Sequence, residues 1–248
     1  MPCDVLLQAA LPEELGPVLE VLTTPAICEI GPWRFWSGRI LGLEVVLSRT
    51  DEGPLNAAAA TALGLHSFQP QALINYGIAG AHDPALRKGD LIVGTEAVDY
   101  SGFRSSSACE GEGIDCGRWA PKPHKIRTGP DTVTPFHRFC SDPALVELAR
   151  RLPYAGGRVL SGTVGTALQF NLEVDRILWI RKTYGTDTAD QETAYAAGVA
   201  AAMGVPFMPL RVISDTVFND PVLEKAFGAQ SAHAALLLLR AIADSRQS

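Results

Sequence analysis

The sequence lacks any apolar run long enough to cross a membrane. Its densest apolar stretch, residues 234–239, lies between His233 and Arg240 and is far shorter than the ~20 residues that a bilayer-spanning helix needs. The start of the chain also lacks a basic segment followed by an apolar one, so it does not resemble a signal peptide. We therefore expect a cytoplasmic protein with no membrane partner.

The sequence also lacks the spacings that mark disulfide frameworks and metal sites. The five cysteines form no C-x-x-C pair, and their odd number argues against a set of structural disulfides. None of the five histidines pairs with another at metal-ligand spacing. We expect reduced thiols, no metal and no cofactor.

Positive charge is scarce and scattered. The chain has 21 basic and 27 acidic residues, for a net charge of −6, whereas nucleic-acid recognition needs a clustered basic face. Apolar residues make up 47% of the 248 residues, which is too many for a disordered chain and enough for one core. We expect no nucleic-acid partner and a single domain over residues 1–248.

Strand-like and helix-like segments alternate along the chain. This alternation predicts an α/β fold in which helices flank a mostly parallel central sheet. The predicted strands cover residues 5–7, 33–40, 43–48, 72–76, 158–164 and 205–214, with another beginning at residue 91. Two predicted helices begin near residues 12 and 54, and four more cover residues 143–152, 174–182, 189–203 and 221–243. Gly204 would end the helix 189–203.

Residues 101–135 differ in composition from the rest. They are rich in serine, glycine and proline, which predicts a long irregular excursion from the domain. Phe103, Trp119 and Ile126 in this segment are apolar, which is unfavourable in a solvent-exposed loop. Such side chains are favourable in a subunit interface or in a lid.

Ligand sites in α/β folds lie at the carboxyl ends of strands. Gly77, Ile78 and Gly80 follow a buried strand, and two explanations remain open for them: a plain tight turn, or a close approach of ligand to backbone. His82 follows directly and is a possible site residue. Neither a dinucleotide fingerprint nor a phosphate-binding P-loop is present.

Two acidic segments each allow a structural and a functional interpretation. Asp190 and Glu192 lie at the start of a predicted helix. Their carboxylates would either interact favourably with the helix dipole or bind paired hydroxyls such as those of ribose. Ser214 and Asp215 end an apolar strand, where Asp215 would cap the next helix or act as a general acid.

Six segments, in this order, resemble the nucleoside phosphorylase/nucleosidase superfamily, and within it the 5′-methylthioadenosine/S-adenosylhomocysteine nucleosidases. They are residues 10–14 (ALPEE), 75–80 (NYGIAG), 89–93 (GDLIV), 161–162 (SG) with 170–171 (FN), 190–194 (DQETA) and 211–215 (RVISD). The resemblance implies a phosphorylase/hydrolase-like fold and cleavage of a purine nucleoside by water.

The same resemblance implies roles for individual residues. Glu14, or its neighbour Glu13, matches the carboxylate that activates water, and Asp215 matches the acid that protonates N7 of the purine. Three of the remaining matches would contact the substrate: Glu192 would bind the ribose hydroxyls, Phe170 would stack on the face of the base, and Asn171 would contact the edge of the base. Arg211 matches the arginine that helps to organise the nucleophile site. Such enzymes would also assemble as homodimers or larger oligomers.

The sequence departs from the family pattern at two positions. Ile78 stands where the family usually has Ser or Thr, whose hydroxyl contacts the nucleophile, and Gln191 stands where it often has Met. A phosphorylase, a futalosine-type hydrolase and a non-catalytic nucleoside-binding protein are therefore alternatives. Water is the favoured nucleophile, because the carboxylates of Glu13 and Glu14 would repel a phosphate dianion.

Overall fold

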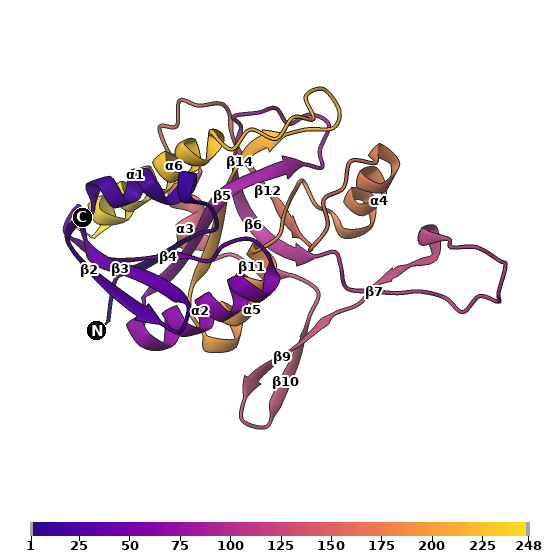
Figure 1. Ribbon diagram of the computed structural model, residues 1–248, viewed down its shortest axis with the longest axis horizontal. Helices are drawn as coiled ribbons and strands as arrows, with labels where there is room; N and C mark the ends of the chain where they lie inside the picture. The colour runs from indigo at the N-terminus through magenta and orange to yellow at the C-terminus, as the bar shows by residue number, and fades with distance from the viewer. Residues whose placement is uncertain (1, 247–248) are drawn as a thin grey trace.

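The centre of the protein is a ten-stranded sheet, seen in the computed structural model, which describes residues 2–246 (Figure 1). The strand order is β11-β6-β12-β13-β5-β1-β4-β3-β2, and β14 pairs with both β5 and β6. The strands are β1 (Val5–Ala9), β2 (Thr23–Ile30), β3 (Trp33–Ile40), β4 (Leu43–Arg49), β5 (Ala72–Ala81), β6 (Leu91–Asp99), β11 (Phe139–Cys140), β12 (Val159–Thr166), β13 (Thr188–Asp190) and β14 (Phe207–Asp215).

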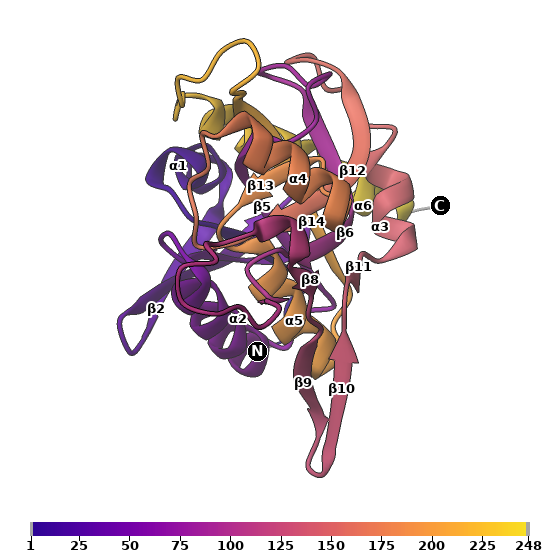
Figure 2. The same ribbon diagram turned by 90° about the vertical axis from the view of Figure 1, so that its right-hand side faces the viewer.

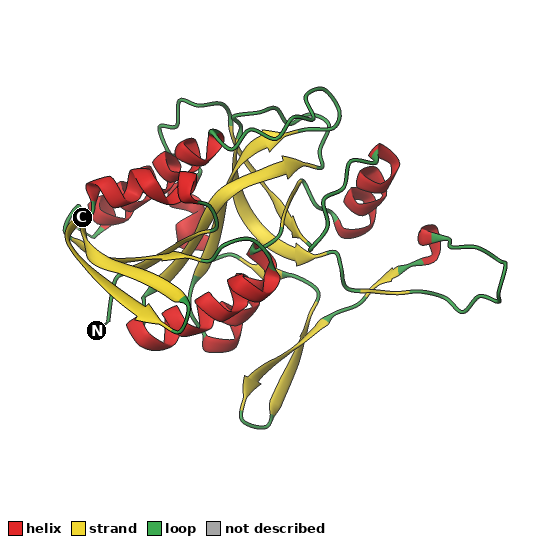
Figure 3. Ribbon diagram, viewed as in Figure 1, coloured by secondary structure: helices red, strands yellow, loops and turns green. Residues whose placement is uncertain are grey.

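Helices cover both faces of this sheet (Figures 1 and 3). One face is covered by α1 (Pro12–Val21), α3 (Pro143–Ala149) and α6 (Phe227–Ser245), and the other by α2 (Pro54–Phe68) and α5 (Thr193–Met203). Helix α4 (Val174–Tyr184) packs against the end of β6. Every residue of β1 and of β14 is buried, as expected for strands covered on both faces. The predicted α/β fold is confirmed.

The strand directions bring distant segments to one edge of the sheet. Strands β1, β5 and β14 run parallel, so the segments that follow β1 and β14 leave the sheet at the same edge. Strand β13 crosses that edge antiparallel to β5, where Thr188 pairs with Ala81 and Ala189 with Gly80. The segment after β13 therefore also begins there.

The glycine-rich segment is part of a strand, and its interpretation as a tight turn is wrong. Gly77, Ile78 and Gly80 all lie within β5, which continues to Ala81 because β14 pairs with it along this length. The predicted helix 189–203 is also too long, since residues 188–190 form β13 and α5 begins at Thr193. Helix α6 begins at Phe227, later than the predicted residue 221.

Residues 101–135 project from the body of the protein but are not irregular throughout (Figure 2). They contain a hairpin of β9 (His124–Gly129) and β10 (Thr132–Phe136), a small pair of β7 (Phe103–Arg104) and β8 (Ala120–Pro121), and the 3-10 turn Cys116–Arg118. The rings of Phe103 and Trp119 stack with centroids 4.1 Å apart. Among residues 2–246, every helix is too short or too polar to serve as a membrane span.

The tight approach of β14 to β6 yields a test of the fold. A Cβ atom at Gly94 would lie 2.4 Å from Cγ of the rigid Pro209 ring, whereas one at Gly129 in β9 would meet only ordinary contacts at 3.4 Å. We expect Gly94→Ala to reduce the free energy of unfolding by about 1–3 kcal/mol. Gly129→Ala is the matched control and should change it by less than about 0.5 kcal/mol. Equal effects of the two variants in urea unfolding would contradict this packing.

Candidate active site

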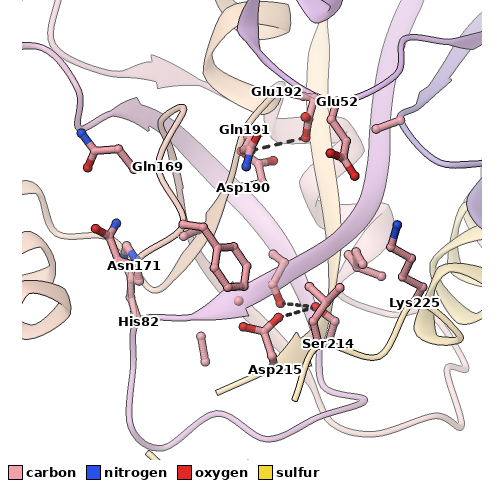
Figure 4. A pocket seen from close by; sticks show the side chains of 18 of the residues that line it. Glu52, His82, Gln169, Asn171, Asp190, Gln191, Glu192, Ser214, Asp215 and Lys225 are labelled. Carbon is pink, nitrogen blue, oxygen red and sulfur yellow. Dashed lines mark hydrogen bonds between the residues drawn. The ribbon is translucent and has the colours of Figure 1, made fainter. Parts of the chain in front are cut away.

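A cavity of about 460 Å³ opens at this edge of the sheet (Figure 4). We refer to it as the central cavity. Four buried carboxyl groups line it: Glu14 in the first turn of α1, Asp190 and Glu192 just before α5, and Asp215 at the end of β14. Of the other residues predicted for the site, those that line it are Ile78, Gly80, Phe170, Asn171, Gln191 and Ser214.

The Glu14 carboxylate is held by three backbone N–H groups. Oε2 accepts hydrogen bonds from the amides of Ala10 and Leu11, and Oε1 accepts one from Ile78, each at 2.9 Å. Burial raises the pKa of Glu14, and these hydrogen bonds partly oppose the rise. Position 78 therefore contacts Glu14 through its backbone N–H, and this contact does not depend on the side chain.

Glycines allow this carboxylate to approach the sheet. A Cβ atom at Gly77 would lie 2.6 Å from Oε1 of Glu14, and one at Gly228 in α6 would lie 3.1 Å from its Cγ. Glu14 is thus enclosed by β5 and α6, whereas Glu13 is exposed and does not line the central cavity. Of the two neighbouring acids, the geometry favours Glu14 for chemistry in the cavity.

Asp215 lies across the central cavity from Glu192 (Figure 4). Its Oδ1 accepts a hydrogen bond of 2.7 Å from the Ser214 hydroxyl, and burial raises the pKa of the carboxyl. A raised pKa favours the protonated form that a general acid needs. The interpretation as a helix cap is wrong, because the next helix begins only at Phe227.

The Glu192 carboxylate is also strongly perturbed. Oε1 accepts a hydrogen bond of 2.7 Å from the amide of Gly53, while burial and the nearby charge of Asp190 raise the pKa of Glu192 well above its ordinary value. Glu192 makes no side-chain cap to α5, and its other oxygen, Oε2, accepts only a long contact of 3.3 Å from the Gln191 amide. That oxygen can therefore still accept hydrogen bonds from a ligand hydroxyl.

Arg211 lies behind the central cavity and does not line it. Its Nε donates to Asp190 at 2.7 Å, Nη1 donates to the carbonyls of Asn75 and Leu210, and Nη2 donates to Thr193 and to the Asn75 side chain. Every N–H donor of the guanidinium is thus already used. Arg211 positions the segments around the site and has no donor left for a ligand.

A small polar recess adjoins Glu14. It measures about 10 Å³ and is lined in part by Glu14, Ile78, Glu192 and Arg211. A cavity needs roughly 10–15 Å³ to hold one water molecule, so the recess is of the right size for a single water and too small for a phosphate ion. It lies between the carboxylate of Glu14 and that of Glu192.

The part of the central cavity lined by Phe170, Asn171 and His82 is suited to a flat ring. Phe170 is 62% exposed although it is aromatic, and Nδ2 of Asn171 lies 3.5 Å from the Tyr100 hydroxyl. His82 also lines the cavity; burial lowers its pKa to about 4, so the ring is neutral at pH 7. Tyr100 was missed in the sequence because nothing local distinguishes it from an ordinary core tyrosine.

Comparisons with known proteins identify the family of the chain. The family model of the Phosphorylase superfamily matches residues 4–244, and the chain belongs to that family. It is 28% identical over 241 residues to the 5′-methylthioadenosine/S-adenosylhomocysteine nucleosidase of Shewanella denitrificans, covering 94% of this chain and 95% of that one. It is 29% identical over 218 residues to the nucleosidase of the same name from Geobacillus kaustophilus, covering 86% and 85%.

Solved structures share the fold. The nucleosidase of Neisseria meningitidis, solved in complex with methylthio-immucillin-A, superposes with a TM-score of 0.76 at 23% identity and covers 96% of this chain and 98% of that one. The Campylobacter jejuni enzyme gives a TM-score of 0.77 at 23% identity, with 98% and 99% covered. The predicted phosphorylase/hydrolase-like fold is therefore confirmed.

The pKa of Glu192 predicts how stability depends on pH. Because the folded-state pKa is raised above the ordinary value of 4.5, ionisation weakens the folded state as the pH rises from that value. Glu192→Gln can keep the bond from Gly53 and removes this penalty. We expect the difference in melting temperature, variant minus wild type, to grow by several degrees as the pH is raised from about 5 to about 8. A difference that is constant with pH would contradict the raised pKa.

Proposed function

We propose that the protein is a nucleosidase that uses water to cleave the N-glycosidic bond of an adenosine thioether, such as 5′-methylthioadenosine or S-adenosylhomocysteine. The observation that carries this proposal is the buried Glu14 carboxylate, which lines both the central cavity and a recess about the size of one water molecule. The names of the most similar relatives support the same substrates. We propose a cytoplasmic location and a single functional domain for the chain.

The charges around the central cavity support this reaction. Breaking the bond leaves negative charge on the base and positive, oxocarbenium-like charge on the sugar. Asp215, with its raised pKa, would donate a proton to N7 of the base, while Glu192 would bind the ribose hydroxyls through Oε2. Glu14 would remove a proton from the water in the recess.

The remaining site residues would orient the substrate. We assign Phe170 to stacking on the base and Asn171 to its edge, and Ser214 to holding Asp215 through its hydroxyl. Gly80 would let β5 approach the ligand closely, Ile78 would present an apolar side chain to it, and Gln191 would contact the sugar beside Glu192. None of these roles needs a metal or a cofactor.

The phosphorylase alternative is weaker on two counts. Arg211 has no N–H left to bind a phosphate dianion, and the ionised forms of Glu14, Asp190 and Glu192 would repel it. A non-catalytic binding protein would release no base from any nucleoside, whereas a futalosine-type hydrolase would release base from futalosine but not from 5′-methylthioadenosine. Assaying both nucleosides therefore separates these alternatives from the proposal.

Adenine should be released from 5′-methylthioadenosine in buffer that contains no phosphate, because water occupies the attacking position. The assay measures free adenine and the sugar product by chromatography, with and without added phosphate. Release that requires phosphate and yields a sugar 1-phosphate would identify a phosphorylase. Tight nucleoside binding without any base release would identify a non-catalytic protein.

Asp215→Asn tests the general acid. The variant keeps the shape of the side chain but loses the transferable proton, and general acid catalysis contributes about 100- to 10,000-fold, so kcat should fall by that factor. Substrate affinity should change far less, since the asparagine amide can still donate to N7. A variant with full kcat and an unchanged melting temperature would remove Asp215 from the mechanism.

We also propose that the protein forms a homodimer or a larger symmetric assembly. The projecting segment 101–135 exposes apolar side chains, with Ile114 at 89% and Val133 at 50% exposure, which an interface would cover. Light scattering at micromolar concentration should give at least twice the chain mass of 26.4 kDa. A monomer mass under these conditions would contradict the proposal.

A further inference from the structure

Two charged side chains line the central cavity without a partner among the residues that the structure describes. They are Glu52, which precedes α2, and Lys225, which precedes α6. Neither side chain makes a hydrogen bond or an ion pair with another residue in the described range 2–246. The hydrolysis described above does not use either of them, so their charges are available for another part of the substrate.

Glu52 is placed next to the ribose site by the chain itself. The amide of the following residue, Gly53, donates the 2.7 Å hydrogen bond to Oε1 of Glu192. A sugar whose hydroxyls are bound by Glu192 therefore lies within reach of the Glu52 carboxylate. The backbone contact also fixes where the segment between β4 and α2 meets the cavity.

Lys225 lies in the segment 216–226, which Lys88 ties to the body of the protein. The Lys88 ammonium is 2.8 Å from Asp220 and 2.6 Å from Glu224, so this segment has a defined position. Val217 and Leu223 of the same segment also line the cavity and contribute apolar side chains to it.

The two charges lie away from the end of the cavity that suits the base. In Figure 4, Gln169, Asn171 and His82 line one side of the cavity, and Glu52 and Lys225 line the other. With the base at Asp215 and the ribose at Glu192, the substituent on C5′ would extend toward the side of Glu52 and Lys225.

The chemistry of the C5′ substituent decides what these charges can recognise. A methylthio group carries no charge and would leave both side chains without a partner. An α-amino acid joined through a thioether brings apolar methylenes, one ammonium and one carboxylate. These groups match the apolar surface of Val217 and Leu223, the carboxylate of Glu52 and the ammonium of Lys225, respectively.

We propose that Glu52 and Lys225 form a subsite for the zwitterionic amino-acid tail of an S-adenosylhomocysteine-type substrate, and that they favour it over a methylthio substrate. This inference rests on the proposed nucleosidase activity and extends it to the choice of the C5′ substituent. It makes Glu52 and Lys225 specificity-determining residues, remote from the bond that breaks.

Four substrates test the subsite, each measured as kcat/KM for adenine release. They are the homocysteine thioether of adenosine, its analogue without the carboxylate, its analogue without the amino group, and 5′-methylthioadenosine. We expect wild type to favour the zwitterion by about tenfold or more, since each charge-assisted hydrogen bond contributes roughly 3- to 10-fold at an open cavity end. High salt should reduce this preference.

Two variants assign the groups. Glu52→Gln should lower kcat/KM only for the substrates that carry the amino group, and Lys225→Met only for those that carry the carboxylate. The matched controls are Glu20→Gln and Lys182→Met, exposed charges outside the cavity, which should leave every substrate within twofold. For both cavity variants, the value for 5′-methylthioadenosine should also stay within twofold.

The outcomes separate this inference from the proposed function. Adenine release from 5′-methylthioadenosine with no preference for the zwitterion, or an equal loss on all substrates in either cavity variant, would overturn the subsite alone. Absence of adenine release from all four substrates would overturn the nucleosidase itself and the subsite with it.

Discussion

The ion pair between Arg211 and Asp190 is the interaction on which the site depends. Both side chains are 2% exposed, and their charged groups lie 2.7 Å apart. Through this pair and its hydrogen bonds, Arg211 joins β14 to β13, to the start of α5 at Thr193 and to Asn75 in β5. Removing one partner would leave an uncompensated buried charge, which is costly. The same pair places Asp190 beside Glu192, where it helps to raise the pKa of that carboxyl.

Around this pair, the protein places carboxyl groups where their ionised forms are unfavourable. Glu14, Glu192 and Asp215 are all buried, and burial raises the pKa of each. Their surroundings differ in a way that suits different roles. Glu14 accepts three backbone N–H bonds that favour its charged form, whereas Asp215 has a single hydroxyl donor. Similar residues therefore suit a base and an acid.

The two ends of the cavity differ in polarity as well as in shape. The base end combines the exposed ring of Phe170 with a neutral His82, so it offers stacking and hydrogen bonds without net charge. The other end presents Glu52 and Lys225, which have no partners in the described part of the chain. In the proposed function, the charged C5′ substituent and the base are thus recognised by separate segments, which can vary independently.

The sequence by itself determined the alternation of strands and helices and the segments that carry Glu14, Glu192 and Asp215. These features are local, because periodicity, glycine and acidic residues report on the few residues around them. The same local signals misplaced Gly77 and Gly80 in a turn, since the pairing that extends β5 comes from β14, more than a hundred residues away. Only the tertiary structure showed that Arg211 has no free donor, that the recess beside Glu14 is about the size of one water molecule, and that Glu52 and Lys225 face one cavity. Each of these depends on which strands lie side by side, and that order follows from packing of the whole chain.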